Sequence, residues 1–335
     1  MPRRNRADGV DEFQSIARLF APLTDGAPEA LGLTDDAAVI PARPGFDLVV
    51  SKDAMVAGVH FLPDDPLDLV ARKLLRANLS DLAAKGADPY AYLLSAAWPP
   101  GCGWPERERF VAGLRHDQDA FGVRLIGGDT TGTPGPLTLS ITILGWTPTG
   151  RMVRRSGARP GDRVFVTGTI GDGWLGLKAA RGEELDGLAA EHVDWLADRY
   201  RLPQPRLGFS RALRDLASAA LDVSDGLIAD AGHLAAASDV AVALHLERLP
   251  QSDAADAWLD RQPDLVAALA ALAVGGDDYE VVCTAAPAVA AQLGAAAKDA
   301  GVGLTEIGEV AEGQGVRADF EGEAIAFAKT GWRHG

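Results

Sequence analysis

A basic and irregular stretch at residues 151–161 is the feature of this sequence that most constrains its fold. It contains a Pro-Gly turn signal, and short apolar runs alternate with helical periodicities both before and after it. A pattern that restarts in this way is typical of two domains that each mix helices and strands. Because the chain of 335 residues also exceeds the size at which one core usually stops growing, we expect one domain in residues 1–150 and a second in residues 151–335.

The spacing of apolar residues predicts the elements of both halves. The clearest helix is 66–85, which begins with a proline and places its leucines on one face. In the first half we also expect helices at 12–20 and 106–121 and strands at 37–40, 48–51, 90–97, 123–126 and 137–146. In the second half we expect strands at 163–167, 220–223, 240–246, 279–284, 304–310, 315–319 and 324–327, with helices between them that include 183–200. The predicted fold class is α/β mixed (α+β).

The charge and the cysteines narrow the class of protein. A formal net charge of −15 argues against nucleic acid as a partner, because such binding needs a broad basic surface. Cys102 and Cys283 have no metal-ligand spacing, which suits a reducing compartment. The basic segment 1–6 lacks the apolar region of a secretory signal, and no run of 18 apolar residues occurs. We therefore expect a soluble cytoplasmic protein with no membrane partner.

The sequence contains no complete signature of the common nucleotide-binding folds. Residues 171–176 match G-x-G-x-x-G, but a dinucleotide fold needs a second strand with an acidic residue about 20 positions on, and the segment that follows here is predicted to be helical. We interpret the motif as a glycine-rich turn from a strand into a helix. The sequence also lacks the G-x-x-x-x-G-K-[ST] loop and the H-R-D and D-F-G motifs of protein kinases.

Aspartates instead recur at the ends of apolar strands or in tight loops beside them. The segments are 35–36, 51–53, 127–131, 222–226 and 275–279, and Asn78 and Asp81 share one face of the long helix. Any one of these aspartates is explained as a turn or capping residue, but their recurrence beside glycine with few basic partners favours a common site. Magnesium prefers carboxylates together with substrate phosphates, and metal ions reconcile an acidic chain with a polyphosphate substrate. The residues alone thus predict a site where metal ions, most simply magnesium, bridge carboxylates to a polyphosphate such as ATP.

Ordered motifs along nearly the whole chain resemble the thiamine-monophosphate kinase family of the aminoimidazole-ribonucleotide-synthetase-like superfamily. The motifs lie at 32–37, 51–61, 78–89, 127–131, 155–158, 166–168, 222–227 and 275–280. The resemblance implies the two-domain fold of that superfamily and ATP-dependent phosphorylation of thiamine monophosphate to thiamine diphosphate by direct in-line transfer, the last step of thiamine diphosphate biosynthesis. It also implies several magnesium ions and a homodimer. Residues 1–150 would bind ATP and magnesium and dimerise through strands of their sheet, and residues 151–335 would complete the nucleotide and substrate site.

The resemblance also implies a role for individual residues. The magnesium positions would be Asp36, Ser51, Lys52 through its backbone, Asp53, Asp81, Asp129, Asp222 and Asp225, with Asp53 and Asp129 catalytic. The ATP contacts would be Gly128, Asp129, Arg155 and Ser224. The contacts to the thiamine substrate would be His60, Asp277 and Trp332.

Two positions depart from the family pattern, and two other readings stay open. Lys52 stands where the family has Thr, and Asp277 stands where it has Glu. One alternative is a sister enzyme, such as aminoimidazole-ribonucleotide synthetase, selenophosphate synthetase or the hydrogenase-maturation type. Selenophosphate synthetase is expected to carry a reactive cysteine near its start, whereas the first cysteine of this chain is Cys102. The hydrogenase-maturation type is expected to end in a cysteine, whereas this chain ends at Gly335. The other alternative is a non-catalytic nucleotide- or metal-binding protein on the same scaffold.

Overall fold

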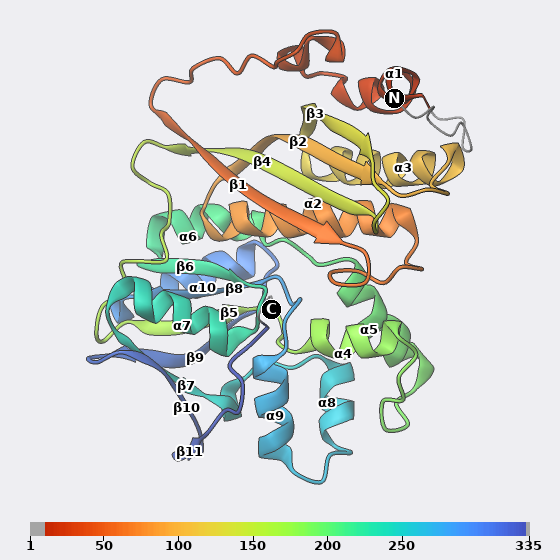
Figure 1. Cartoon of the computed structure of the whole chain (residues 1–335). Helices are drawn as coiled ribbons and strands as arrows, with labels where there is room; N and C mark the ends of the chain where they lie inside the picture. Colours follow the sequence, from red (N-terminus) through yellow and green to blue (C-terminus); the bar gives the residue numbers. More distant parts are fainter. Residues whose placement is uncertain (1–10, 333–335) are drawn as a thin grey trace. The chain divides into compact units, whose positions relative to one another are not determined.

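The computed structural model describes residues 11–332. The basic segment 1–6 and Gly335, both discussed above, lie outside the described residues. The chain separates into two compact units, one of Met1–Leu79 with Pro89–Trp146 and one of Ser80–Asp88 with Thr147–Gly335. Each unit has its own sheet and its own helices (Figure 1). The expected mixed α/β class is confirmed.

The first unit is built on a four-stranded sheet. Its strands are β1 (Phe46–Val56), β2 (Asp88–Trp98), β3 (Arg124–Gly132) and β4 (Thr138–Pro148), in the order β1-β4-β2-β3. β2 and β3 run parallel, with a register shift between Tyr92 and Leu93. The order leaves β1 and β3 as the two edges of the sheet.

Two long helices pack together in this unit. They are α2 (Leu67–Ala84) and α3 (Trp104–Phe121), and Leu74, Leu75, Leu79 and Leu82 of α2 are fully buried. Gly113 of α3 lies so close to the main chain of Asp68 that a Cβ would overlap it. The buried carboxylate of Asp117 accepts hydrogen bonds from Arg72 and Arg76 of α2, so the close contact carries a charge pair as well as apolar packing.

The segment before β1 is helical at first and irregular afterwards. It contains α1 (Glu12–Ser15), the π-helical η1 (Ile16–Phe20) and the 3-10 helices η2 (Ala21–Thr24) and η3 (Pro28–Leu33). The expected strand at 37–40 is wrong. Ala38 and Ile40 pack against a small cluster on β2, β3 and β4, and Val39 is 61% exposed. The apolar run is used for packing against a sheet face rather than for pairing with a strand.

The second unit is built on a seven-stranded sheet. Its order is β11-β10-β7-β9-β5-β8-β6, and the pairings are antiparallel except between β7 and β10 among those described. The strands are β5 (Arg163–Thr167), β6 (Ala219–Val223), β7 (Ala241–His245), β8 (Glu280–Ala285), β9 (Leu304–Ala311), β10 (Gly315–Phe320) and β11 (Glu323–Ile325). The helices are α4 (Asp172–Ala180), α5 (Ala190–Arg201), α6 (Ser210–Leu216), α7 (Leu227–Ser238), α8 (Asp253–Leu259), α9 (Leu265–Val274) and α10 (Ala290–Asp299), with short turns η4 (Leu207–Phe209), η5 (Leu246–Arg248) and η6 (Pro287–Val289).

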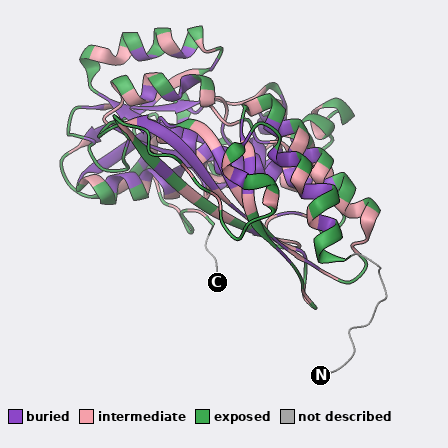
Figure 2. Cartoon of the chain, turned by 90° about the horizontal axis from the view of Figure 1, so that it is seen from above, coloured by how far each residue is buried: buried purple, intermediate pink, exposed green. Residues whose placement is uncertain are grey.

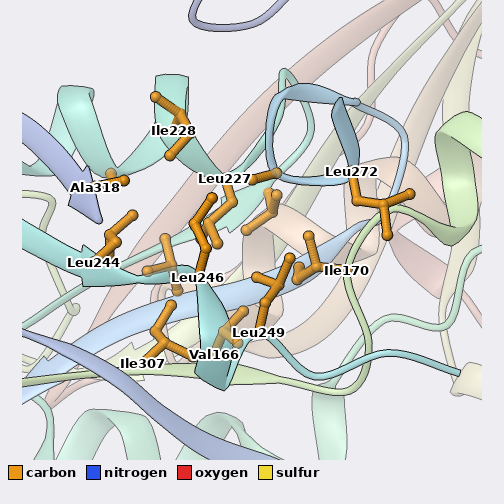
Figure 3. Close-up of a cluster of buried hydrophobic side chains, with 14 of the residues drawn as sticks. Val166, Ile170, Leu227, Ile228, Leu244, Leu246, Leu249, Leu272, Ile307 and Ala318 are labelled. Atoms are coloured by element: carbon orange, nitrogen blue, oxygen red, sulfur yellow. The ribbon is translucent and has the colours of Figure 1, made fainter. Parts of the chain in front are cut away.

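Helices bury both faces of this sheet. Val164 and Val166 of β5 join the core beneath α4, α7 and α9, whereas Phe165 joins a second core beneath α6 and α10. Figure 3 shows Val166 in the first core together with Leu227 of α7 and Leu272 of α9. Strands that are buried on both faces read as continuous apolar runs, which is why the strands of this half were predicted well. In Figure 2 many strand residues are buried, while the helices alternate between buried and exposed residues. The expected helix at 183–200 is shorter than predicted, since α5 begins only at Ala190.

No helix among residues 11–332 combines the length and the apolar character that a membrane crossing requires.

Candidate functional site

The sequence pattern suggested that residues 51–53 end a strand. In the structure they lie within β1, which continues to Val56. Alternation along the strand places Ser51 and Asp53 on one face and Lys52 on the other. The N–H of Asp53 donates to the side-chain oxygen of Asn78 on α2 at 3.1 Å. Asn78 is fully buried, and its amide donates to the Leu74 carbonyl at 2.8 Å. Asn78, which the sequence analysis placed on the same helix face as Asp81, therefore holds the backbone of Asp53.

The side chain of Lys52 reaches across to the neighbouring strand. Its ammonium donates to the hydroxyl of Ser140 on β4 at 2.5 Å, and that hydroxyl donates to the carbonyl of Asp53 at 2.8 Å. Ser140 was not found from the sequence, because only the pairing of β4 with β1 places it beside Lys52. Lys52 and Asp53 are neighbours along β1, so their side chains leave the strand on opposite faces.

Asp36, Gly128 and Asp129 come together at a cavity of about 260 Å³ in the first unit. Asp35 and Asp36 line one part of it, and Gly127 to Thr130 of β3 line another. At Gly128, with φ 153°, a Cβ would overlap the Leu94 carbonyl, so only glycine fits beside β2. The remaining lining is mainly apolar and includes Ile16 and Phe20 of η1. An apolar cavity with a few convergent polar groups is the usual form of a small-molecule site.

The structure does not bring Asp53 and Asp129 together within one chain. They lie on β1 and β3, the opposite edges of the four-stranded sheet. Three strand spacings separate the two backbones by about 14 Å. Magnesium–oxygen distances are only about 2 Å, so a single ion cannot be shared by both carboxylates of the same chain.

In the second unit the turn after β6 and the loop before β8 are joined through their main chains. The N–H of Asp277 donates to the Ser224 carbonyl at 2.9 Å, and that of Tyr279 donates to the Val223 carbonyl at 2.8 Å. The N–H of Trp332 donates to the Asp225 carbonyl at 2.9 Å. Three segments that are far apart in the sequence thus meet at one place, and they carry Ser224, Asp225, Asp277 and Trp332 among the predicted site residues.

Asp230 on α7 supports this turn and was not found from the sequence. Its carboxylate accepts the N–H groups of Ser224 and Asp225 at 3.0 and 3.1 Å. Burial, followed by the charge of Asp225, raises the pKa of Asp230 to about 7. Asp225, Asp230 and His233 also offer ligand atoms that lie within 4.8 Å of one another. The only sequence signal for Asp230 was its position as an aspartate in the first turn of the helix that follows the 222–226 segment.

Lys85 provides a positive charge beside the acidic residues of this unit. Its ammonium donates to the Ala220 carbonyl on β6 at 2.7 Å. Burial lowers the pKa of Lys85 to about 8, while the carboxylates of Asp222 and Asp81 oppose that shift. Asp222 is itself only 7% exposed, so Lys85 partly neutralises a buried carboxylate.

His60 lies in the turn after β1 and is fixed by that turn. Its Nδ1 accepts the N–H of Val56 at 3.0 Å, which leaves the ring proton on Nε2 when the imidazole is neutral. Arg155 is exposed in the irregular stretch before β5, and Trp332 is 56% exposed.

Comparison with known proteins agrees with this architecture. The family model for the N-terminal domain of AIR synthase related proteins matches residues 34–147, and the model for the C-terminal domain matches residues 159–321. The two halves of the chain therefore have the two domains of the AIR synthase related proteins.

Individual relatives narrow the class further. The thiamine-monophosphate kinase of Caulobacter vibrioides is 55% identical over 97% of this chain and 91% of its own length. The crystal structure of thiamine-monophosphate kinase from Stenotrophomonas maltophilia K279a has a TM-score of 0.81 and 38% identity, covering 94% of this chain and 98% of that one. A structure of AaThiL complexed with AMPPCP and TMP has a TM-score of 0.75 and 28% identity, covering 97% and 99%. The chain belongs to the thiamine-monophosphate kinase family of the AIR synthase related proteins.

Proposed function

We propose that this protein phosphorylates thiamine monophosphate with ATP to give thiamine diphosphate, the last step of thiamine diphosphate biosynthesis. The proposal rests on two places where an aspartate directly follows a glycine that packs closely against neighbouring backbone. They are Gly128 with Asp129 and Gly276 with Asp277. The relative AaThiL was solved with AMPPCP and TMP, a non-hydrolysable ATP analogue and the proposed substrate class.

Direct in-line transfer suits the acceptor. An oxygen of the substrate phosphate forms a bond to the γ-phosphorus of ATP as the bond to the β-phosphate oxygen breaks, and ADP leaves. The acceptor oxygen is already anionic, so no strong general base is needed. The barrier is mainly charge repulsion and positioning. The side chains of this site act by orienting the two phosphates rather than by exchanging protons.

The proposed ligands fit magnesium, because each of them offers an oxygen atom and magnesium prefers hard oxygen ligands. The proposed ligands are Asp36, Ser51, the Lys52 carbonyl, Asp53, Asp81, Asp129, Asp222 and Asp225. Bound magnesium supplies charge neutralisation at the phosphates. Since Asp53 and Asp129 lie on opposite edges of their sheet, we assign them to different ions.

The remaining roles follow from side-chain chemistry. Arg155 pairs with ATP phosphates through its planar guanidinium, and Gly128 and Ser224 contact the nucleotide. Trp332 presents a flat ring to the heteroaromatic substrate. His60 and Asp277 complete the substrate contacts. In this proposal residues 1–150 bind ATP and magnesium, and residues 151–335 complete the nucleotide and substrate site.

We further propose a homodimer that forms through β1. This strand is an edge of the sheet, and Leu48 and Val50 on the face opposite Asp53 are 38% and 55% exposed. An exposed apolar edge strand favours pairing with another chain. We also propose a cytoplasmic location, which suits free cysteines at positions 102 and 283.

The deciding experiment incubates the purified full-length protein with ATP, magnesium and thiamine monophosphate and measures thiamine diphosphate by chromatography. A parallel reaction with EDTA should form none. The assignment is lost if no thiamine diphosphate forms while aminoimidazole-ribonucleotide or hydrogenase-maturation substrates are turned over. Absence of turnover with every substrate, together with ATP binding, would favour a non-catalytic binding protein.

A further inference from the structure

The buried carboxylate of Asp278 caps the N-terminus of α4. Asp278 is 1% exposed, and its two oxygens accept the N–H groups of Gly171 and Gly173 at 2.8 Å each. A helix N-terminus attracts anions through its unpaired N–H groups and its dipole. The start of the G-x-G-x-x-G motif at 171–176 is therefore occupied by a carboxyl group of the same domain.

The glycines of the motif make this contact possible. At Gly171, with φ 94°, a Cβ would lie 2.6 Å from the side chain of Leu272. At Gly173 a Cβ would overlap the carbonyl group of Asp277. The first turn of α4 therefore packs directly against the main chain of the 276–279 loop, and any larger residue at Gly173 would displace that loop.

The same loop has an unusual backbone. Asp277 and Tyr279, the two neighbours of Asp278, have φ values of 70° and 52°. Left-handed geometry at residues other than glycine is strained and persists only where the surroundings impose it. Here the N–H groups of both residues bond to the carbonyls of Ser224 and Val223, and the carboxylate between them bonds to α4. The loop is held on two sides.

We propose that Asp278 is a positioning residue for the substrate: by capping α4 it holds Asp277 in the orientation that contacts thiamine monophosphate. This inference rests on the proposed function, in which Asp277 is a substrate contact. Asp230 has the corresponding role on the other side of the contact, because it braces the Ser224–Asp225 turn through two N–H groups of its own. One buried carboxylate thus supports the substrate loop, and a second supports the nucleotide and metal turn.

The test compares Asp278→Asn with Asp230→Asn and Asp172→Asn in the full-length enzyme. Asparagine retains one acceptor oxygen, but its amide group would face a glycine N–H that it cannot accept. Asp172 is the matched control, because it is equally buried in the same turn but accepts from the hydroxyls of Thr169 and Ser252 instead of holding the loop.

Steady-state kinetics should separate the three variants. We expect Asp278→Asn to raise the KM for thiamine monophosphate about tenfold and to leave the KM for ATP within about twofold. Asp230→Asn should instead raise the KM for ATP or the magnesium requirement, and Asp172→Asn should change neither KM. Equal changes in both KM values for Asp278→Asn, or a lower melting temperature with unchanged kinetics, would overturn the positioning role.

A second variant covers the possibility that Asp278→Asn does not fold. Gly173→Ala keeps the carboxylate and adds a helix-favouring residue, yet its Cβ displaces the Asp277 carbonyl. It should weaken binding of thiamine monophosphate, measured by calorimetry without ATP, and unchanged binding would refute the proposal. Failure of the proposed function is distinguished by the wild-type enzyme, which would then form no thiamine diphosphate at all.

Discussion

The hydroxyl of Ser238, at the end of α7, donates to the carbonyl of Arg155 at 3.1 Å and accepts the N–H groups of Gly157 and Ala158 at 3.1 and 3.2 Å. One side chain thus fixes the turn that follows Arg155. At Gly157, with φ 128°, a Cβ would lie 2.5 Å from the Ser218 carbonyl, so the same turn also lies against the start of β6. The backbone of an exposed arginine is thus held by a serine more than eighty residues away in the chain.

Ser238→Ala should therefore raise the KM for ATP by about three- to tenfold, because three hydrogen bonds to the Arg155 turn are lost. The KM for thiamine monophosphate should stay within about twofold. Ser252→Ala is the control, since this serine caps α8 and bonds to Asp172, away from the turn. It should lower stability by about 1 kcal/mol without changing either KM. Identical kinetics for Ser238→Ala and the wild type would contradict a role for the turn.

Asp53→Asn and Asp129→Asn should each reduce kcat by at least about 100-fold, because each is proposed to hold an ion at the transferring phosphate. The readout is the initial rate of thiamine diphosphate formation at saturating magnesium. Asp119→Asn is a suitable control, since this exposed residue of α3 only pairs with Arg124 at 3.5 Å and exposed pairs contribute little. Near-normal rates for both site variants would disprove the metal assignment.

His60→Ala should mainly raise the KM for thiamine monophosphate. The variant also removes the hydrogen bond from the Val56 N–H to Nδ1 of His60, so the turn after β1 is held less firmly. His116→Ala, on exposed α3 surface beside Asp117, should leave both KM values unchanged. A change confined to ATP would assign His60 to the nucleotide instead of the substrate.

Glu280→Gln should lower the free energy of unfolding by about 3 kcal/mol. The carboxylate of Glu280 is fully buried and accepts from Arg199 at 3.1 Å, from Thr167 at 2.8 Å and from Nε of Arg206 at 2.6 Å. Its loss leaves two guanidinium groups without a buried counter-charge. Glu309→Gln removes the half-exposed pair with Arg163 and should cost less than about 1 kcal/mol. Urea unfolding of both variants measures the difference, and equal losses would contradict the argument.

The stability difference between the wild type and Asp278→Asn should depend on pH. Burial, the largest cause, raises the pKa of Asp278 well above its ordinary 3.8. A carboxyl with a raised pKa in the folded state favours folding at low pH, and that contribution is lost as pH rises from the ordinary pKa through the raised one. The wild type should therefore lose stability relative to Asp278→Asn as pH increases from about 4. A difference that stays flat from pH 4 to 8 would show that the folded-state pKa is not raised.

Most helices and strands were predictable because burial imposes a period on the sequence. The strand expected at 163–167 is β5, and the helix expected at 66–85 is α2 within one residue at each end. The strand expected at 37–40 failed because its alanine and isoleucine pack against a sheet face without a neighbouring strand. An apolar run reports burial, and burial alone does not distinguish pairing from packing.

The sequence by itself determined the mixed α/β class, the family motifs and the identity of the acidic residues, because these depend on local pattern and on side-chain chemistry. Only the tertiary structure decided which of those residues meet. The strand order separates Asp53 from Asp129, whereas main-chain hydrogen bonds join the Ser224–Asp225 turn to Asp277 and Trp332. It also showed that the side chain of Asp278 accepts the N–H groups of Gly171 and Gly173 in the glycine motif at 171–176. These relationships depend on segments that lie fifty or more residues apart in the chain, which local periodicity does not encode.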